Sequence, residues 1–108
     1  MVATAAAIEL DSYVIDVLMR DLVRHDKRPS AFIVYVYLAV RAEREMRAKG
    51  IPASYTTIAN ATGLSKTAVQ KAVAHLLKRK LISVAKASAT ATPVYRLNRH
   101  WRPRLRND

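Results

Sequence analysis

Cysteine is absent from the 108-residue sequence, and only two glycines are present. Without cysteine the chain can form no disulfide, no thiolate zinc site and no cysteine nucleophile. The three histidines, His25, His75 and His100, are far apart in the sequence and lack the spacing of metal ligands. There is also no glycine-rich loop that would bind a phosphate. We therefore expect no metal or other cofactor and no enzymatic activity.

Long apolar runs are also lacking. The longest run, residues 31–40, has ten residues, whereas a membrane-spanning helix needs about twenty. The first residues, MVATAAAIELDSY, lack the basic start of a secretory signal and reach acidic residues early. We expect a cytoplasmic, nucleoid-associated protein without a membrane contact.

Acidic residues are scarce: eight stand against nineteen lysines and arginines, which gives a formal charge of +11. The charge is uneven along the chain. Residues 1–26 contain two basic and five acidic residues and sum to −3, whereas residues 27–108 contain seventeen basic and three acidic residues and sum to +14. Such a balance favours a polyanionic partner, and the second part of the chain would bind it.

A chain of this length makes a single domain with one modest core. Residues 1–8 have little pattern and are expected to be frayed. From residue 9 to 24 apolar side chains recur in steps of three and four, which predicts an amphipathic helix. After a turn at residues 25–30, a second helix is predicted from about residue 30 to 48.

The second predicted helix is apolar on every side over residues 31–40. Such a helix lies either at the centre of a core or against another subunit. Two alternatives remain open. One is a homodimer through helices 9–24 and 30–48. The other is complete burial of the second helix by its neighbours within one chain.

Residues 55–80, YTTIANATGLSKTAVQKAVAHLLKRK, predict two helices joined by a tight turn at Gly63. A glycine can adopt the left-handed conformation that ends one helix and starts the next segment. Ser54 and Ser65 precede the two helices and suit N-caps. The helices are predicted at about residues 55–61 and 66–80.

Two later segments, residues 81–85 and 94–97, predict the strands of a β-hairpin. The connection, residues 86–93, lacks the Gly or Asn of a tight primed turn, so we expect a longer, mobile loop. The tail, residues 98–108, carries four arginines around Trp101. It is either a flexible arm lying on DNA or a tail whose Trp101 docks on the core.

At these residues the chain resembles the winged helix-turn-helix DNA-binding domains of bacterial and phage transcriptional regulators and replication proteins. The pattern of that family is matched by Ile58-Ala59, Gly63, Leu64 and Val69. Further matches are Thr57, Thr62, Ser65, Ala68, Ala72-Val73, Leu76 and Leu81-Ile82. The resemblance covers residues 30–98. It implies a mostly α fold with a small β-hairpin, in which two N-terminal helices (9–50) precede the helix-turn-helix (55–80) and the wing (81–97).

The resemblance also implies that helix 66–80 binds in the major groove of double-stranded DNA. If its apolar stripe faces inward, its polar side chains face bases and phosphates. Gln70 suits an adenine, Lys66 or Lys71 a guanine, and Ser65 with the helix N-terminus a phosphate. The predicted DNA-binding residues are Tyr55, Thr56, Thr57, Ser65, Lys66, Thr67, Gln70, Lys71, Lys78 and Arg79.

The implied function is sequence-specific binding of double-stranded DNA, with control of transcription as its consequence. One alternative is the DNA-binding module of a phage or plasmid replication or partition system. Another is a winged-helix module for protein–protein interaction. The sequence indicates no small-molecule partner.

Overall fold

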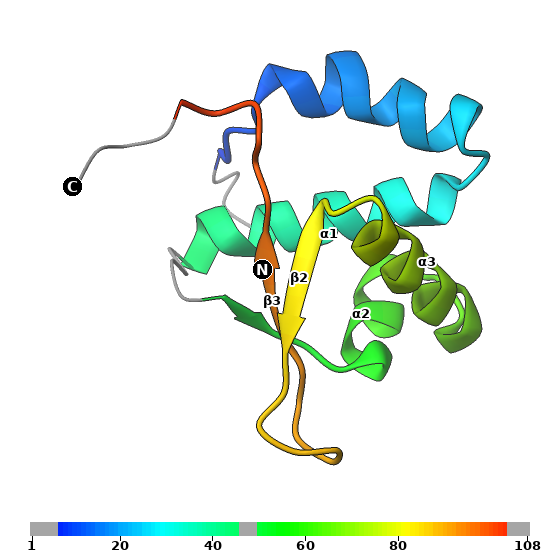
Figure 1. The fold of residues 1–108 in the computed structure, drawn as a ribbon, viewed down its shortest axis with the longest axis vertical. Helices are drawn as coiled ribbons and strands as arrows, with labels where there is room; N and C mark the ends of the chain where they lie inside the picture. Colours follow the sequence, from blue (N-terminus) through cyan, green and yellow to red (C-terminus); the bar gives the residue numbers. More distant parts are fainter. Residues whose placement is uncertain (1–6, 46–49, 104–108) are drawn as a thin grey trace, which may run out of the picture.

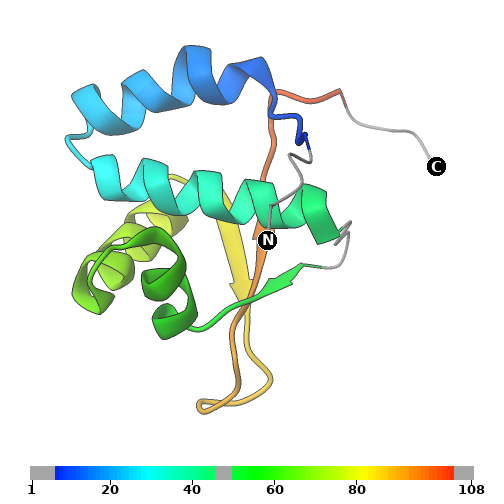
Figure 2. The same cartoon turned by 180° about the vertical axis from the view of Figure 1, so that it is seen from behind.

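The computed structural model describes residues 7–45 and 50–103, which form a mostly helical fold with four helices and a small antiparallel sheet (Figure 1). The first helix, residues 12–25, lies side by side with the long helix α1 (Pro29–Glu45). Two shorter helices, α2 (Tyr55–Thr62) and α3 (Lys66–Lys78), lie across α1 from the first helix (Figures 1 and 2). The predicted class, mostly helical with a small β-hairpin, is confirmed at this level.

Some of the sequence-based predictions lie outside the described residues. They concern the fraying of residues 1–6, the last turn of the second helix within residues 46–49, and the end of the basic tail at residues 104–108. Within residues 7–45 and 50–103, no helix combines the length and the apolar character needed to cross a membrane.

The first helix begins at Ser12, so the prediction of a start at residue 9 was wrong. Asp11 stands directly before this start, and its carbonyl oxygen accepts the N–H of Val14 at 3.0 Å in the first turn of the helix. The side chain of Asp11 is held by the C-terminal tail, as described below.

The first helix is also wider than a regular α-helix. Its two segments η1 (Val14–Leu18) and η2 (Asp21–His25) have π-helical hydrogen bonds, such as the bond from the N–H of Asp26 to the carbonyl of Asp21 at 2.8 Å. In a pure α-helix of 3.6 residues per turn, side chains four apart drift around the axis. The wider turns offset this drift, so Val14, Leu18 and Leu22 all stay buried against the core.

Helix α1 is the centre of the core and contacts the first helix, α2, α3 and both β1 and β3. The start of α1 at Pro29 agrees with the prediction, and proline suits the first position of a helix. Its fully buried residues form one broad face, whereas Phe32, Val36, Tyr37 and Val40 are half-buried; the fully buried residues are Ala31, Val34, Tyr35, Leu38 and Ala39. Packing within the chain therefore covers most of α1, while the predicted homodimer remains a prediction.

The turn between α2 and α3 has the predicted form. Gly63 takes a left-handed conformation with φ of 83°, and its N–H donates to the carbonyl of Ala59 at 2.9 Å. The hydroxyls of Ser54 and Ser65 cap the two helices by accepting backbone N–H groups at 3.1 and 3.0 Å. Helix α3 ends at Lys78, two residues before the predicted end, because Lys80 adopts a left-handed φ of 59° that turns the chain into the sheet.

The sheet has three strands in the order β1-β3-β2. The hairpin of β2 (Ile82–Ala85) and β3 (Val94–Leu97) was predicted, with the loop of residues 86–93 between the strands. Strand β1 (Ile51–Pro52) was not predicted, and it pairs with β3 at the sheet edge, where a proline is tolerated. Gly50 precedes it with φ of 123°, and a Cβ there would lie only 2.6 Å from Cγ1 of Val94.

The described part of the tail, residues 98–103, lies against the start of the first helix. The ring of Trp101 stacks on Tyr13 at 4.5 Å with an interplanar angle of 13°, and its Nε1 donates to Asp11 at 2.7 Å. The guanidinium of Arg102 donates two further hydrogen bonds to the same carboxylate, at 2.7 and 2.8 Å. For these residues the docked tail, and not the flexible arm, is the alternative that the structure supports.

The carboxylate of Asp11 therefore joins the two ends of the described chain. The hydrogen bonds from Arg102 lower its pKa to about 2, although burial of the carboxyl group opposes this shift and the Trp101 N–H adds to it. Since the folded-state pKa lies below the ordinary value of 3.8, this stabilisation is present above about pH 4 and is lost as the pH falls toward 2.

Substitution Asp11→Ala tests this contact. We expect it to lower the free energy of unfolding at pH 7 by about 1–2 kcal/mol, because the charged hydrogen bonds are partly exposed. The single tryptophan reports the change directly. Its emission maximum should move to longer wavelength and acrylamide should quench it more strongly. The exposed neighbour Glu9 provides the control, and an Asp11→Ala spectrum identical to that of Glu9→Ala would contradict the docked tail.

Candidate nucleic-acid interface

Helix α3 presents one apolar and one polar face. Its residues Val69, Ala72, Val73 and Leu76 are buried in the core. Each of the residues predicted to face DNA on this helix up to Lys78 is exposed: Lys66, Thr67, Gln70, Lys71 and Lys78. The structure thus brings five of the ten predicted residues together on one helix face.

The start of α2 lies beside this face. Thr56 and Thr57 are exposed and Tyr55 is half-buried. The hydroxyl of Thr57 lies 3.0 Å from the Ser54 hydroxyl, and its N–H donates to the same oxygen, so Thr57 belongs to the helix cap. Thr56 is exposed and follows Tyr55 at the start of α2.

A groove of about 310 Å³ separates the start of α2 and α3 from the hairpin loop. Both apolar and polar side chains line this groove. The apolar side chains include Val73, Leu77 and Val84, and the polar set includes Ser54, Thr56, Lys66 and Lys86. Lys86, on the hairpin loop, was not among the predicted residues. Only the packing of the loop against α3 reveals it, since the sequence gives no distance between residues 66 and 86.

Acidic residues are absent from this whole region. Between Glu45 and Asp108 the sequence contains no aspartate or glutamate. Helix α3 and the hairpin loop therefore present the exposed Lys66, Lys71 and Lys86 in a stretch of sequence without acidic residues. A concave surface with charges of one sign raises the local concentration of an oppositely charged polymer.

Besides Thr57, two further predicted residues have other bonds in the structure. The hydroxyl of Ser65 accepts the N–H of Ala68 at 3.0 Å as the cap of α3. The guanidinium of Arg79 donates to the carboxylate of Asp26 and lies 3.8 Å from Asp21. Arg79 therefore differs from Lys66, Lys71 and Lys78, and its role in DNA binding stays a prediction that the ion pair weakens.

The Asp26 carboxylate ties the end of the first helix to the end of α3. Its side chain is only 5% exposed, and it lies 2.8 Å from Nδ1 of His25 and 2.8 Å from Nε2 of His75, in addition to its bond with Arg79. Burial alone would raise the pKa of Asp26, but the hydrogen bonds from the two histidines and the charge of Arg79 outweigh it and lower the pKa to about 2. His75 and Arg79 are one helical turn apart, which is how one carboxylate reaches both.

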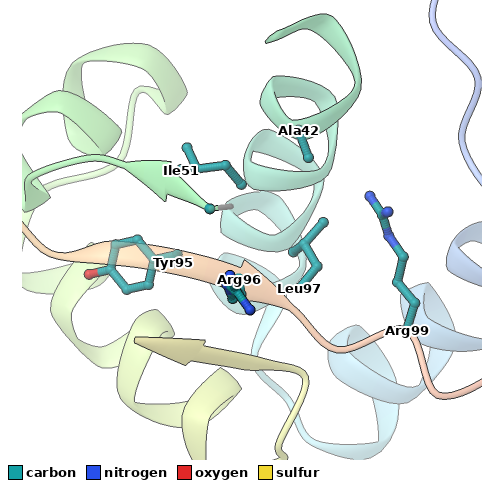
Figure 3. A pocket seen from close by; sticks show the side chains of 7 residues that line it. Ala42, Ile51, Tyr95, Arg96, Leu97 and Arg99 are labelled. Atoms are coloured by element: carbon teal, nitrogen blue, oxygen red, sulfur yellow. The ribbon is translucent and has the colours of Figure 1, made fainter. Parts of the chain in front are cut away.

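A second cavity, of about 200 Å³, lies at the other end of the sheet. Figure 3 shows Leu97 and Arg99 extending from β3 and the segment after it toward the end of α1, with Ala42 on the opposite wall. None of the predicted DNA-binding residues lines it, and Arg99 is already paired with Glu43 at 3.5 Å. This cavity is therefore separate from the candidate interface.

Metal ligation finds no support in the described part of the chain, where no group of three or more His, Cys, Asp or Glu residues could hold an ion. The cluster around Asp26 is an ion-pair network. Its histidines and arginine donate to a single carboxylate, and this geometry satisfies the charge without a cation.

Comparison with known proteins gives no match, since no family model, no curated protein and no solved structure matches the chain. The resemblance to winged helix-turn-helix domains remains a prediction from the sequence.

Substitution of Asp26 tests how α3 is held. We expect Asp26→Asn to lower the free energy of unfolding at pH 7 by about 2–3 kcal/mol, because it leaves Arg79 and His75 without a buried anion. The loss should shrink as the pH falls from 4 toward 2, where Asp26 of the wild type becomes protonated. Urea unfolding at several pH values measures both effects. Asp21→Asn is the control, since Asp21 contacts the same arginine but is 43% exposed. Equal losses in the two variants would contradict a special role for Asp26.

Proposed function

We propose that this protein binds double-stranded DNA through the exposed face of α3 and that this binding is sequence-specific and regulates transcription. The observation that carries the proposal is the exposed set of Lys66, Thr67, Gln70, Lys71 and Lys78 on a helix whose other face is fixed in the core. Lysine and glutamine side chains can read base edges in the major groove, while the remaining lysines suit phosphates.

The surroundings of α3 support the same proposal. The N-terminus of α3 lies at the exposed residues Ser65, Lys66 and Thr67, and the free backbone N–H groups of a helix N-terminus favour a phosphate. The groove beside it adds Thr56 and Lys86. In this arrangement α3 enters the major groove, the start of α2 contacts one phosphate strand, and the hairpin loop lies over the other as a wing.

The acid-free stretch gives the proposal its electrostatic basis. Carboxylates on the same face would compete with phosphates for the lysines, but the described acidic residues lie on the first helix, on the segments flanking it and on α1. Release of counterions by the lysines would make the binding strongly dependent on salt.

A salt series tests the proposal. We expect fluorescence anisotropy with random-sequence duplex DNA to show tight binding at low salt. The triple variant Lys66→Ala/Gln70→Ala/Lys71→Ala should reduce the slope of log K against log[salt] by about 2, one for each lost lysine–phosphate contact. Selection of a preferred site from random duplexes should then fail for the variant and succeed for the wild type.

A second triple variant, Ser12→Ala/Arg28→Ala/Arg44→Ala, is the matched control. It also removes two positive charges, but these come from exposed positions outside α2, α3 and the hairpin. Its salt slope should stay within error of the wild type. Equal slopes for the two triple variants would reject binding through α3, and weak, salt-insensitive binding by the wild type would favour a protein partner.

A further inference from the structure

The outer face of the first helix carries exposed hydrophobic side chains. Ile15 is 46% exposed, and Met19 and Val23 are each 39% exposed. They follow one another at spacings of four residues, directly beside the buried positions Val14, Leu18 and Leu22. We call Ile15, Met19 and Val23 the outer stripe.

The π-helical turns make the outer stripe straight. In a regular α-helix a four-residue spacing drifts around the axis, but the wider turns of η1 and η2 hold the buried row in line with α1. Each residue of the outer stripe comes directly after a buried residue in the sequence. The outer stripe is therefore parallel to the buried row and to the helix axis. Side chains four residues apart form a ridge that can pack into the groove of a second helix.

The charged residues beside the outer stripe indicate which partner fits this surface. The exposed neighbours of the stripe are Asp16, Arg20 and Arg24, with the acid toward the helix start and the bases toward its end. When a second copy of the same helix runs in the opposite direction, Asp16 meets the bases of the other copy on both sides of a two-fold axis. A parallel pairing would instead place like charges level with one another.

The charge of the whole chain points to the same face. Two copies that each carry +11 repel one another over most of their surface. The exposed charged residues beside the outer stripe, Asp16, Arg20 and Arg24, sum to only +1, so this repulsion is small at the outer stripe.

We propose that two copies of this chain pair through their outer stripes in an antiparallel, two-fold arrangement. Met19 contacts Met19 of the partner subunit at the axis, and Ile15 contacts Val23 of the partner subunit. Asp16 lies between the partner subunit's Arg20 and the partner subunit's Arg24. One helix pair is smaller than the ~800 Å² per partner of a standard interface, so this dimer dissociates on dilution.

This inference goes beyond the proposed function and does not depend on it. The first helix and α2 lie on opposite sides of α1 in both views (Figures 1 and 2), so the pairing leaves α2 and α3 exposed. All measurements below are made without DNA, and their failure would leave the DNA-binding proposal as it stands.

Single cysteines test the register, because the natural chain contains none. Under mild oxidation Met19→Cys should form disulfide-linked dimers, since its two copies meet at the axis. Ile15→Cys alone should not, because its two copies lie about 12 Å apart along the helix, beyond the ~7 Å between Cα atoms that a disulfide can bridge. A mixture of Ile15→Cys and Val23→Cys should form the mixed dimer.

The control is Val84→Cys on β2, where the replaced side chain is exposed to a similar extent, 41%. We expect Met19→Cys to cross-link at least ~10-fold faster than this control, because only the former holds its two sulfur atoms within bonding distance. Equal rates would overturn the proposal. Self-cross-linking of Ile15→Cys and Val23→Cys alone would show a parallel pairing and would overturn the antiparallel arrangement.

Charge reversal provides a second test of the pairing. Unfolded variants would not form a dimer again when they are mixed, so loss of folding cannot produce the expected result. By sedimentation over a concentration series, Asp16→Arg alone and Arg20→Glu/Arg24→Glu alone should be monomeric where the wild type dimerises. An equimolar mixture of the two variants should restore the dimer, since every pair of facing charges is again opposite. A wild type that stays monomeric at all concentrations, or a mixture that does not associate, would reject the proposal.

Discussion

The need to cover α1 determines the arrangement of the other elements. Its segment of residues 31–40 is apolar on every side, and exposure of such a helix would cost roughly 25 cal/mol for each Å² left in water. The first helix covers one side, α2 and α3 cover the opposite side, and β1 and β3 contact α1 as well. Every described helix and all three strands therefore share one core.

This constraint also fixes the orientation of α3. Because Val69, Val73 and Leu76 are buried in the shared core, the row of Lys66, Gln70 and Lys71 points to solvent. The pairing of Asp26 with His75 and Arg79 then holds the far end of α3 against the end of the first helix. A helix held at both ends and along one face presents its polar row with little reorganisation, and such preorganisation lowers the entropic cost of binding.

The sequence predicted those features that depend on neighbouring residues. The turn at Gly63, the two serine caps, the helix boundaries near Pro29 and the hairpin strands all follow from local conformational preferences. The features that it did not predict depend on distant residues. Strand β1 exists only because β3 pairs with it, and Asp11 and Arg102 meet across more than 90 residues of sequence. Lys86 joined the candidate site for the same reason.

The ion pairs of the acidic residues connect the stability of the fold with the proposed interface. The −3 charge of residues 1–26 suggests a negative surface, but Asp11 and Asp26 are bound to Arg102 and Arg79. Each of these pairs stabilises the fold and removes one arginine from competition for an anion. The lysines of α3 are exposed, and no acidic residue occurs in the sequence between Glu45 and Asp108. The fold thus uses Arg79 and Arg102 in ion pairs that hold the structure together, whereas Lys66, Lys71 and Lys78 remain exposed.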